Sequence, residues 1–248
     1  MKSKYDLSFI KKEYNSDLLV SEYTRKSIEC GLIESEKHVF EKYIKPSDKI
    51  IDIGCGAGRI SFGLYSLGYK NVYGCDLAPN MIKAAKNLNK QKGLNLHFFI
   101  RDICKRSIFN KKYDVAIFSF NGLMCIPGQK NRKKAVKNIN HMLKEGGLFI
   151  FTAHDREKID SMNEFFKQEK DRWDKAEQGE NLLDFGDVEN PDKFASFLHI
   201  PNSDEIKDLL EENGFAELEI IEKDKLSGID KNNEEIGNCF FYVAKKVR

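Results

Sequence analysis

Short apolar runs alternate along the chain with longer stretches whose apolar residues recur at helical spacing. Short runs rich in Ile, Val and Phe are typical of buried parallel strands, and the stretches between them fit amphipathic helices. This alternation predicts an α/β fold around a mostly parallel sheet. The expected strands cover residues 49–53, 72–75, 96–100, 113–118, 148–151, 216–221 and 239–244.

Two segments lie outside this alternation. Residues 1–45 show helical periodicity and end before Pro46, which cannot continue a helix. Residues 152–200 interrupt the expected return from the fifth strand to the next helix, and within them 196–200 indicates a strand or extended segment. Residues 155–190 hold 12 acidic and 6 basic side chains, with aromatic residues between them. An insertion of this kind at the edge of a sheet favours a substrate lid.

Composition restricts the class of protein. Among 248 residues, 41% are hydrophobic and 32% charged, as in globular proteins, and no apolar run is long enough to span a membrane. The first residues lack the apolar core of a secretory leader. The six cysteines are far apart and form no Cys-x-x-Cys pair, so we expect no zinc or other metal site and a reducing, cytoplasmic location.

Charge is distributed unevenly. Residues 1–150 carry 27 Lys and Arg against 14 Asp and Glu, whereas the remainder carries 14 against 25. A basic half can bind nucleic acid, but Lys83, Lys86 and Lys90 stand at helical spacing without interleaved aromatics. That pattern favours a solvated helix face, so we do not expect a nucleic-acid partner. The acidic half favours a cationic substrate.

The most informative stretch is Lys49-Ile50-Ile51-Asp52-Ile53-Gly54-Cys55-Gly56-Ala57-Gly58-Arg59. It predicts a buried strand, a glycine turn and a helix whose N-terminal amides face a ligand. The glycines at 54, 56 and 58 do not fit the Gly-x-Gly-x-x-Gly spacing of dinucleotide sites. The stretch instead resembles motif I of the class I S-adenosylmethionine-dependent methyltransferases.

This resemblance implies a complete architecture. It implies a Rossmann-like sheet of seven mostly parallel strands with a C-terminal antiparallel hairpin. It also implies a single domain, residues 1–248: cap helices in 1–45, the cofactor-binding core in 46–151, a substrate-lid insertion after strand five in 152–200, and a C-terminal helix and strands in 201–248. The cofactor would be S-adenosylmethionine and the product S-adenosylhomocysteine.

Two acidic residues fit the cofactor's adenosine. Asp76 follows the second strand, 18 residues after Gly58, where a carboxylate can accept hydrogen bonds from both ribose hydroxyls. Asp102 follows the third strand, where the family contacts the adenine amine. The full expected cofactor set is Tyr14, Tyr23, Arg25, Asp52, Gly54, Cys55, Gly56, Gly58, Arg59, Asp76, Leu77, Met81, Arg101, Asp102, Ile103, Ser119, Phe120 and Asn121.

The acceptor side is less defined. Ser119-Phe120-Asn121 stands where the family's base-modifying members carry an Asp/Asn-Pro-Pro-aromatic or Pro-Cys motif, and its difference argues against methylation of nucleic-acid bases. His154, beside Asp155, and His199 are candidate general bases, although either could be a structural residue. The expected substrate-binding residues are Met124, Asp155, Arg156, Trp173 and Phe185.

The sequence therefore predicts methyl transfer to an oxygen or nitrogen of a small-molecule acceptor. An RNA or protein methyltransferase is an alternative within the same class. A non-catalytic sensor or scaffold that binds S-adenosylmethionine is an alternative of another class. We expect a monomer or homodimer without membrane partners.

Overall fold

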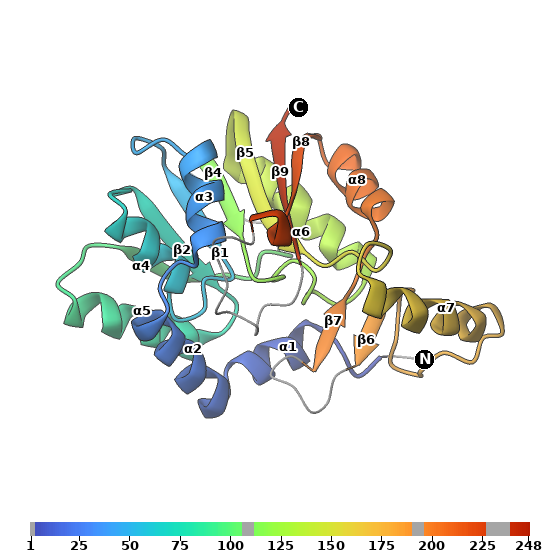
Figure 1. The fold of residues 1–248 in the computed structure, drawn as a ribbon. Helices are drawn as coiled ribbons and strands as arrows, with labels where there is room; N and C mark the ends of the chain where they lie inside the picture. Colours follow the sequence, from blue (N-terminus) through green and yellow to red (C-terminus); the bar gives the residue numbers. More distant parts are fainter. Residues whose placement is uncertain (1–2, 106–111, 190–195, 227–238) are drawn as a thin grey trace.

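The computed structural model describes residues 3–105, 112–189, 196–226 and 239–248, and a seven-stranded sheet organises them (Figure 1). The strand order is β3-β2-β1-β4-β5-β9-β8. Strands β1 to β5 are parallel to one another, whereas β9 is antiparallel to both β5 and β8. The expected sheet is confirmed. Its strands are β1 (Ile50–Ile53), β2 (Val72–Asp76), β3 (His97–Ile100), β4 (Tyr113–Phe118), β5 (Leu143–Ala153), β8 (Phe215–Glu222) and β9 (Phe240–Lys246).

Helices cover both faces of the sheet. On one face, α3 (Glu34–Tyr43), α4 (Arg59–Ser66) and α5 (Pro79–Gln91) bury Phe40, Leu64 and Ile82 in one apolar cluster. On the other, α6 (Gln129–Met142) and α8 (Ser203–Glu212) bury residues of a second cluster that includes Ile139 and Leu210. Burial on both faces explains why the central strands are continuous apolar runs.

Strand β5 is longer than its apolar run predicts. It begins at Leu143, and a register irregularity in its pairing with β4 lies between Tyr113 and Val115. Gly146, at φ +72°, lies within this segment. The sequence predicts a turn there, and the structure incorporates the turn residues into the start of the strand because a bulge tolerates the left-handed backbone.

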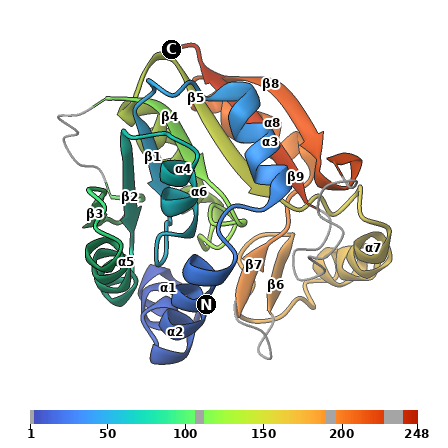
Figure 2. The ribbon, with the colours of Figure 1, turned by 60° about the vertical axis from the view of Figure 1, so that its left-hand side comes forward.

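The remaining elements lie beyond the carboxyl ends of the parallel strands, as Figures 1 and 2 both show. They come from the N-terminal segment and from the insertion. They are α1 (Leu7–Tyr14), α2 (Asp17–Glu29), α7 (Asp160–Asp174), β6 (Asp187–Glu189) and β7 (Phe197–His199); a short 3₁₀ turn, η1 (Lys223–Leu226), follows β8. Strands β6 and β7 pair antiparallel in a separate two-stranded sheet.

Helix α1 is attached to the insertion. The ring of Tyr5 packs on that of Phe197 with a centroid distance of 5.2 Å. The backbone amide of Ser196 donates to Glu13 Oε1 at 3.0 Å, and Lys4 pairs with Glu189 at 3.0 Å. Two segments far apart in sequence therefore form one layer over the carboxyl edge of the sheet. In the part of the chain that is described, no helix has the length and apolar character needed to cross a bilayer.

Candidate functional site

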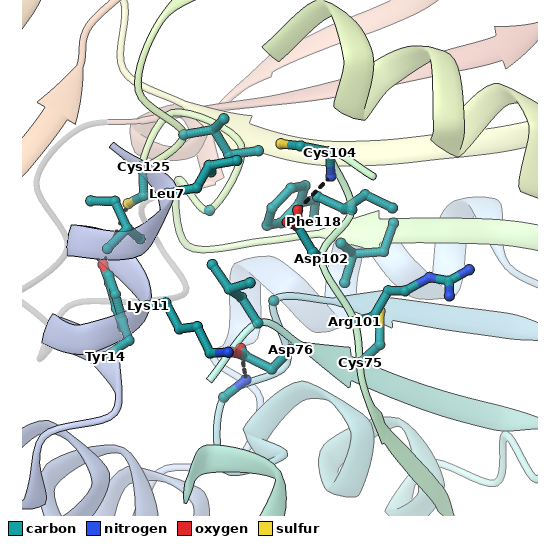
Figure 3. A pocket seen from close by; sticks show the side chains of 18 of the residues that line it. Leu7, Lys11, Tyr14, Cys75, Asp76, Arg101, Asp102, Cys104, Phe118 and Cys125 are labelled. Atoms are coloured by element: carbon teal, nitrogen blue, oxygen red, sulfur yellow. Dashed lines mark hydrogen bonds between the residues drawn. The ribbon is translucent and has the colours of Figure 1, made fainter. Parts of the chain in front are cut away.

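A cavity of about 120 Å³ opens at the carboxyl ends of β1, β2 and β4, beneath α1 (Figure 3). Its floor is the turn between β1 and α4, where Gly54 and Gly56 have φ values of +63° and +53°. A side chain at Gly54 would bring its Cβ within 2.7 Å of the Phe118 ring, and one at Gly56 within 3.2 Å of Tyr23. These two glycines therefore satisfy both the left-handed backbone and the close packing of the cavity floor.

Asp76 ends β2 at the edge of this cavity. Its Oδ2 accepts from the amide of Gly56 at 2.9 Å and its Oδ1 from the amide of Ala78 at 2.8 Å. Burial raises the pKa of this carboxyl, while hydrogen bonds from Ala78 and Gly56 act in the opposite direction. Each carboxylate oxygen retains a lone pair after these bonds, so Asp76 can still accept hydrogen bonds from a vicinal diol.

Asp102 follows β3 on the same side of the cavity. Its Oδ1 accepts from the amide of Cys104 at 3.0 Å, and its carboxylate lies 3.6 Å from Lys105 Nζ. Leu77 and Ile103 add apolar lining nearby. Asp76 can accept hydrogen bonds from a diol and Asp102 from an amine, and apolar side chains lie between them. This arrangement fits the adenosine portion of S-adenosylmethionine.

Asp52 lies deeper, under a small neighbouring cavity lined also by Tyr23, Lys26 and Phe120. The carboxyl is 1% exposed and accepts from Ser61 Oγ at 2.6 Å. Burial raises its pKa to about 7, and the Ser61 hydrogen bond only partly offsets this. This cavity continues the first one at Gly54, so the two together follow the glycine turn.

Arg59 is bound within the protein. Its guanidinium pairs with both oxygens of Glu36 at 2.7 Å and donates to the carbonyl of Gly31 at 2.8 Å. Glu36 Oε1 also accepts from Ser119 Oγ at 3.2 Å, and Glu36 is 2% exposed. This network ties α3 and α4 to the end of β4, so Arg59 lines the smaller cavity while it supports the turn.

The segment after β4 has an unusual backbone. Phe120 and Asn121 both adopt left-handed conformations, with φ values of +56° and +57°. Surrounding contacts hold them: Lys26 Nζ and the Arg59 guanidinium lie 5.6 and 5.7 Å from the centroid of the Phe120 ring, and the Asn121 amide donates to Thr152 Oγ1 at 2.9 Å. Consecutive non-glycine residues in this region are strained, and such strain gathers at functional sites.

Asn121 also contacts His154 at the end of β5. Its Nδ2 lies 3.1 Å from His154 Nε2, and an amide nitrogen can only donate, so this contact fits a neutral imidazole whose Nε2 carries a lone pair. Asn121 Oδ1 is buried without a hydrogen-bond partner. The pair stands beside Ser119 and Phe120, which line the first cavity.

Most of the predicted cofactor set lies at these two cavities. Arg25, Met81, Gly58 and Asn121 line neither. Arg25 pairs with Glu22 and Glu29 on the surface of α2, with its side chain 49% exposed. Met81 is buried in a cluster with Leu19 and Ala78. The residues placed at the cavities are Tyr14, Tyr23, Asp52, Gly54, Cys55, Gly56, Arg59, Asp76, Leu77, Arg101, Asp102, Ile103, Ser119 and Phe120.

Several lining residues are absent from the predicted set. Leu7, Ile10 and Lys11 come from one face of α1, and their spacing of three and four residues is the signal that could have identified them. Cys125 also lines the cavity and accepts from the Tyr14 hydroxyl at 3.4 Å. Burial raises the pKa of the Cys125 thiol to about 11, which disfavours the reactive thiolate.

The remaining predicted residues gather elsewhere. Met124, Trp173, Phe185 and His199 line a second cavity of about 410 Å³ between α6, α8 and the insertion. His199 is 4% exposed and is held between two carboxylates: its Nδ1 lies 2.8 Å from Asp187 Oδ1 and its Nε2 lies 3.3 Å from Glu205 Oε2. The structure thus separates the two histidines predicted as bases.

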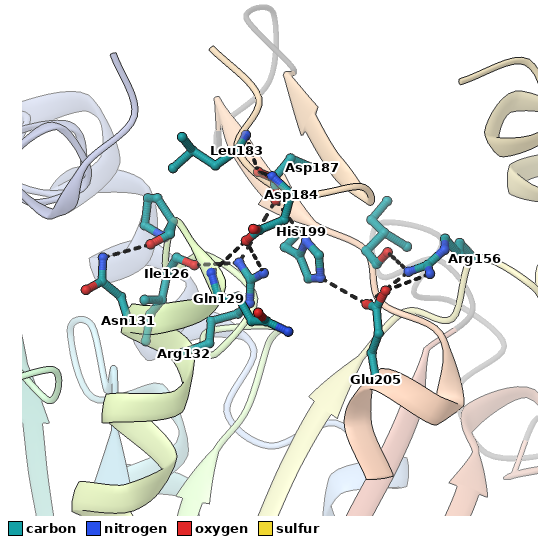
Figure 4. A network of polar contacts seen from close by, with 12 residues as sticks. Ile126, Gln129, Asn131, Arg132, Arg156, Leu183, Asp184, Asp187, His199 and Glu205 are labelled. Atoms are coloured by element: carbon teal, nitrogen blue, oxygen red, sulfur yellow. Dashed lines mark hydrogen bonds and ion pairs between the residues drawn. The ribbon is translucent and has the colours of Figure 1, made fainter. Parts of the chain in front are cut away.

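A polar network attaches the insertion to the core (Figure 4). Asp184 Oδ2 accepts from the amide of Gln129 at 2.6 Å, at the start of α6, and from Arg132 at 2.7 Å. Arg156 forms a two-point pair with Glu205 of α8. These contacts join the insertion to α6 and α8.

Asp155 belongs to the same attachment. It is 1% exposed and accepts from Ser203 Oγ at 2.7 Å, and Lys158 lies 3.5 Å away. Asp155 and Arg156 therefore contact α8 and the segment before it, and neither lines a cavity described above. Within the described ranges, no cluster of three or more His, Cys, Asp or Glu side chains is arranged to hold a metal ion.

The model of a methyltransferase domain family matches residues 44–214. The chain belongs to this family. With its fold, this places it among the Rossmann-like class I methyltransferases, whose methyl donor is S-adenosylmethionine. The match includes the glycine turn, Asp76, Asp102 and the segment after β4.

Comparison with individual proteins supports this placement. A putative methyltransferase of Invertebrate iridescent virus 6 is 31% identical over 157 residues, which cover 62% of this chain and 55% of the viral protein. The human eEF1A lysine and N-terminal methyltransferase is 28% identical over 112 residues, 45% of this chain and 16% of that protein. The chain thus spans about half of the viral relative and a small part of the human one.

Among solved structures, the magnesium protoporphyrin IX methyltransferase of Synechocystis PCC 6803 with bound S-adenosylhomocysteine has a TM-score of 0.64. The likeness covers 97% of this chain and 100% of that one at 15% sequence identity. At this identity it establishes the shared fold.

Proposed function

We propose that this protein transfers a methyl group from S-adenosylmethionine to an oxygen or nitrogen atom of a small-molecule acceptor. The observation that carries the proposal is the set of groups around the first cavity: glycine amides, the half-satisfied carboxylate of Asp76, and Asp102 beside apolar side chains. When bound, the cofactor supplies a methyl carbon on a positively charged sulfur, and the acceptor's lone pair displaces that sulfur, which keeps the bonding electron pair.

The acceptor is proposed to approach from the edge formed by β4 and β5. Asn121 and His154 stand there beside the cavity-lining Ser119 and Phe120. A hydroxyl acceptor must lose a proton, and the neutral imidazole of His154 can take it; an amine acceptor needs to be neutral but needs no base. The strained backbone at Phe120 and Asn121 holds the asparagine amide against the ring.

A small acceptor is favoured by the layer over this edge. Helix α1 lines the first cavity and is joined to the insertion through Tyr5, Glu13 and Ser196. A joined layer limits the space for a folded protein or an RNA duplex and helps to keep water from the reacting atoms. This supports a compact acceptor.

A protein acceptor is the second candidate. The human relative is named as a methyltransferase of eEF1A lysine and the N-terminus. A lysine side chain is narrow enough to reach a covered cavity. The identity of the methylated product therefore decides between a small-molecule and a protein acceptor.

The test is transfer of a radiolabelled methyl group from S-adenosylmethionine into a cell extract separated into low-molecular-mass and protein fractions. We expect label in the low-molecular-mass fraction, and roughly 30-fold less label with Asp76→Asn at the same limiting cofactor concentration. Label confined to protein would overturn the small-molecule proposal in favour of the second candidate. Calorimetric binding of S-adenosylhomocysteine without any transfer would make the protein a sensor, and no binding would exclude the cofactor.

A further inference from the structure

The second cavity lies on the other side of the segment that follows β4. Met124 lines it, whereas Cys125 and Ile126 line the cofactor cavity. The His199 amide donates to the carbonyl of Met124 at 2.9 Å, which fixes the insertion to this segment. With a volume of about 410 Å³, the second cavity has room for a small organic molecule.

Aromatic side chains form its insertion wall. Trp173 of α7 and Phe185 meet edge to face with a centroid distance of 6.1 Å, and Phe166 packs on Phe185 in the same manner at 6.0 Å. Leu183 and Met124 add apolar lining. The Arg156 guanidinium already lies 4.9 Å from the centroid of the Phe185 ring, so this wall suits a short hydrocarbon chain.

The cationic side chains of the lining already have partners. Arg132 pairs with Asp184 at 2.7 Å and is 3% exposed. Lys133 pairs with Glu212 of α8 at 2.6 Å. An anionic ligand would have to displace one of these carboxylates.

The acidic side chains are not all neutralised. Glu205, Asp208 and Glu212 project from α8 at helical spacing and line the cavity. Glu205 has Arg156 and His199 as partners. Among the described residues, Asp208 has no cation within 4 Å, although it stands between the two paired acids. Burial opposes the charge of Glu205, but hydrogen bonds from His199 and Arg156 lower its pKa to about 2, so this carboxyl stays ionised.

We propose that the second cavity binds an organic cation with a short apolar chain, such as a primary alkylammonium. Its charge pairs with Asp208 at the α8 side, and its chain lies against Trp173 and Phe185. This goes beyond methyl transfer, because the site is separate from the cofactor cavity.

Trp173 provides a direct test, since it is the chain's single tryptophan. Intrinsic fluorescence is titrated with n-butylammonium, with 1-butanol and butyrate as probes of similar size. We expect a saturable change with butylammonium alone. An equal response to butanol would show that the cavity binds apolar chains without regard to charge. Tighter binding of butyrate would show that the cavity prefers an anion. Either result would contradict the proposal.

Asp208→Asn should weaken butylammonium about fivefold, the effect of one solvent-accessible ion pair. Asp204→Asn, on the same helix but outside the cavity lining, is the matched control and should bind within about twofold of the parent chain. Equal affinity in both variants, or no saturable signal in the parent chain, would overturn the proposal. The titration requires neither the cofactor nor methyl transfer. A negative titration therefore does not contradict the proposed methyltransferase function, and a failure to detect methyl transfer does not contradict binding of a cation at the second cavity.

Discussion

The two cavities hold their charged groups in different ways. In the cofactor cavity, Asp76 bonds to backbone amides of two adjacent βα turns, at Gly56 and Ala78. In the second cavity, Glu205 bonds to Arg156 and His199, which lie on separate segments of the insertion. The first arrangement is local to the Rossmann-like unit and leaves lone pairs for a ligand. The second arrangement is made by side chains alone, and it mainly joins α8 to the insertion.

Whether a buried carboxylate stabilises or destabilises the fold depends on how many hydrogen-bond and charged partners it has. Asp52 is buried beside the glycine turn with one hydroxyl partner, so its charged form is disfavoured. Asp187 is fully buried but has His199 and two backbone amides as partners. We therefore expect opposite consequences when the two acids are replaced.

Asp52→Asn should give the largest effect. The folded pKa of about 7 lies above the unfolded value of 3.8, so the stability that this carboxyl contributes is present below about pH 4 and is lost as pH rises through 7. The unfolding free energy of the parent chain, relative to Asp52→Asn, should fall by roughly 4 kcal/mol between pH 4 and pH 8. Urea unfolding at both pH values measures this; a difference that does not change with pH would contradict it.

Asp187→Ala should lower the free energy of unfolding by about 3 kcal/mol. The change leaves the buried His199 ring and the amides of Leu183 and Asp184 without their shared acceptor. Urea unfolding at neutral pH measures the loss. Glu189→Gln, which removes the charge paired with Lys4 and alters the acceptor for Asn181 Nδ2, is the control and should cost less than about 1 kcal/mol. Equal costs for the two variants would refute the role of Asp187 as a buried acceptor shared by His199 and the two backbone amides.

His154→Gln tests the acceptor edge. For a hydroxyl acceptor, removal of the base should lower the rate of methyl transfer about 100-fold. Affinity for S-adenosylhomocysteine, measured by calorimetry, serves as the check on the fold, because His154 does not line the cofactor cavity. An unchanged transfer rate would assign the site to an amine acceptor or give His154 a structural role.

Asp76→Asn should weaken S-adenosylhomocysteine roughly 30-fold, or about 2 kcal/mol, the usual contribution of hydrogen bonds to a charged group. The substitution keeps the shape of the side chain but replaces one acceptor oxygen by a donor. Calorimetry measures the affinity. Asp114→Asn, which alters a carboxyl beside Lys49 and Lys144, controls for the general effect of charge. Parent-like binding by Asp76→Asn would remove Asp76 from the cofactor site.

Arg25→Ala should have the smallest effect, with affinity for S-adenosylhomocysteine within about twofold of the parent chain. The side chain lies on the surface of α2 between Glu22 and Glu29. A larger loss would show that α2 repositions Arg25 when the cofactor binds.

The sequence predicted those features that depend on neighbouring residues. Strand and helix periodicity placed the sheet, because central strands buried on both faces have a local apolar signature. The turn at Gly54 and the acid at Asp76 follow from spacing within one βα unit. Even the surface position of Arg25 had a local signal, since Glu22 and Glu29 stand three and four residues away.

Features that depend on packing between distant segments could not be predicted in this way. The sequence gives no indication that His199 lies between Asp187 and Glu205, because that contact requires β7 to meet α8. The wall formed by Leu7 and Lys11 depends likewise on how α1 is held over the sheet. The sequence shows that the insertion is rich in acidic residues. It does not show which partner each acid binds, because those contacts join segments that are distant in sequence.

The attachment of α1 to the insertion has a consequence for biosynthesis. Ser3 Oγ donates to the carbonyl of Asn181 across a separation of 178 residues, and the Tyr5 ring meets Phe197. On the ribosome, α1 emerges well before the insertion residues that support it, because roughly 170 residues separate the two segments. The nascent chain can form the β1–α4 turn early, yet the cofactor cavity gains its upper wall only after β7 has been synthesised.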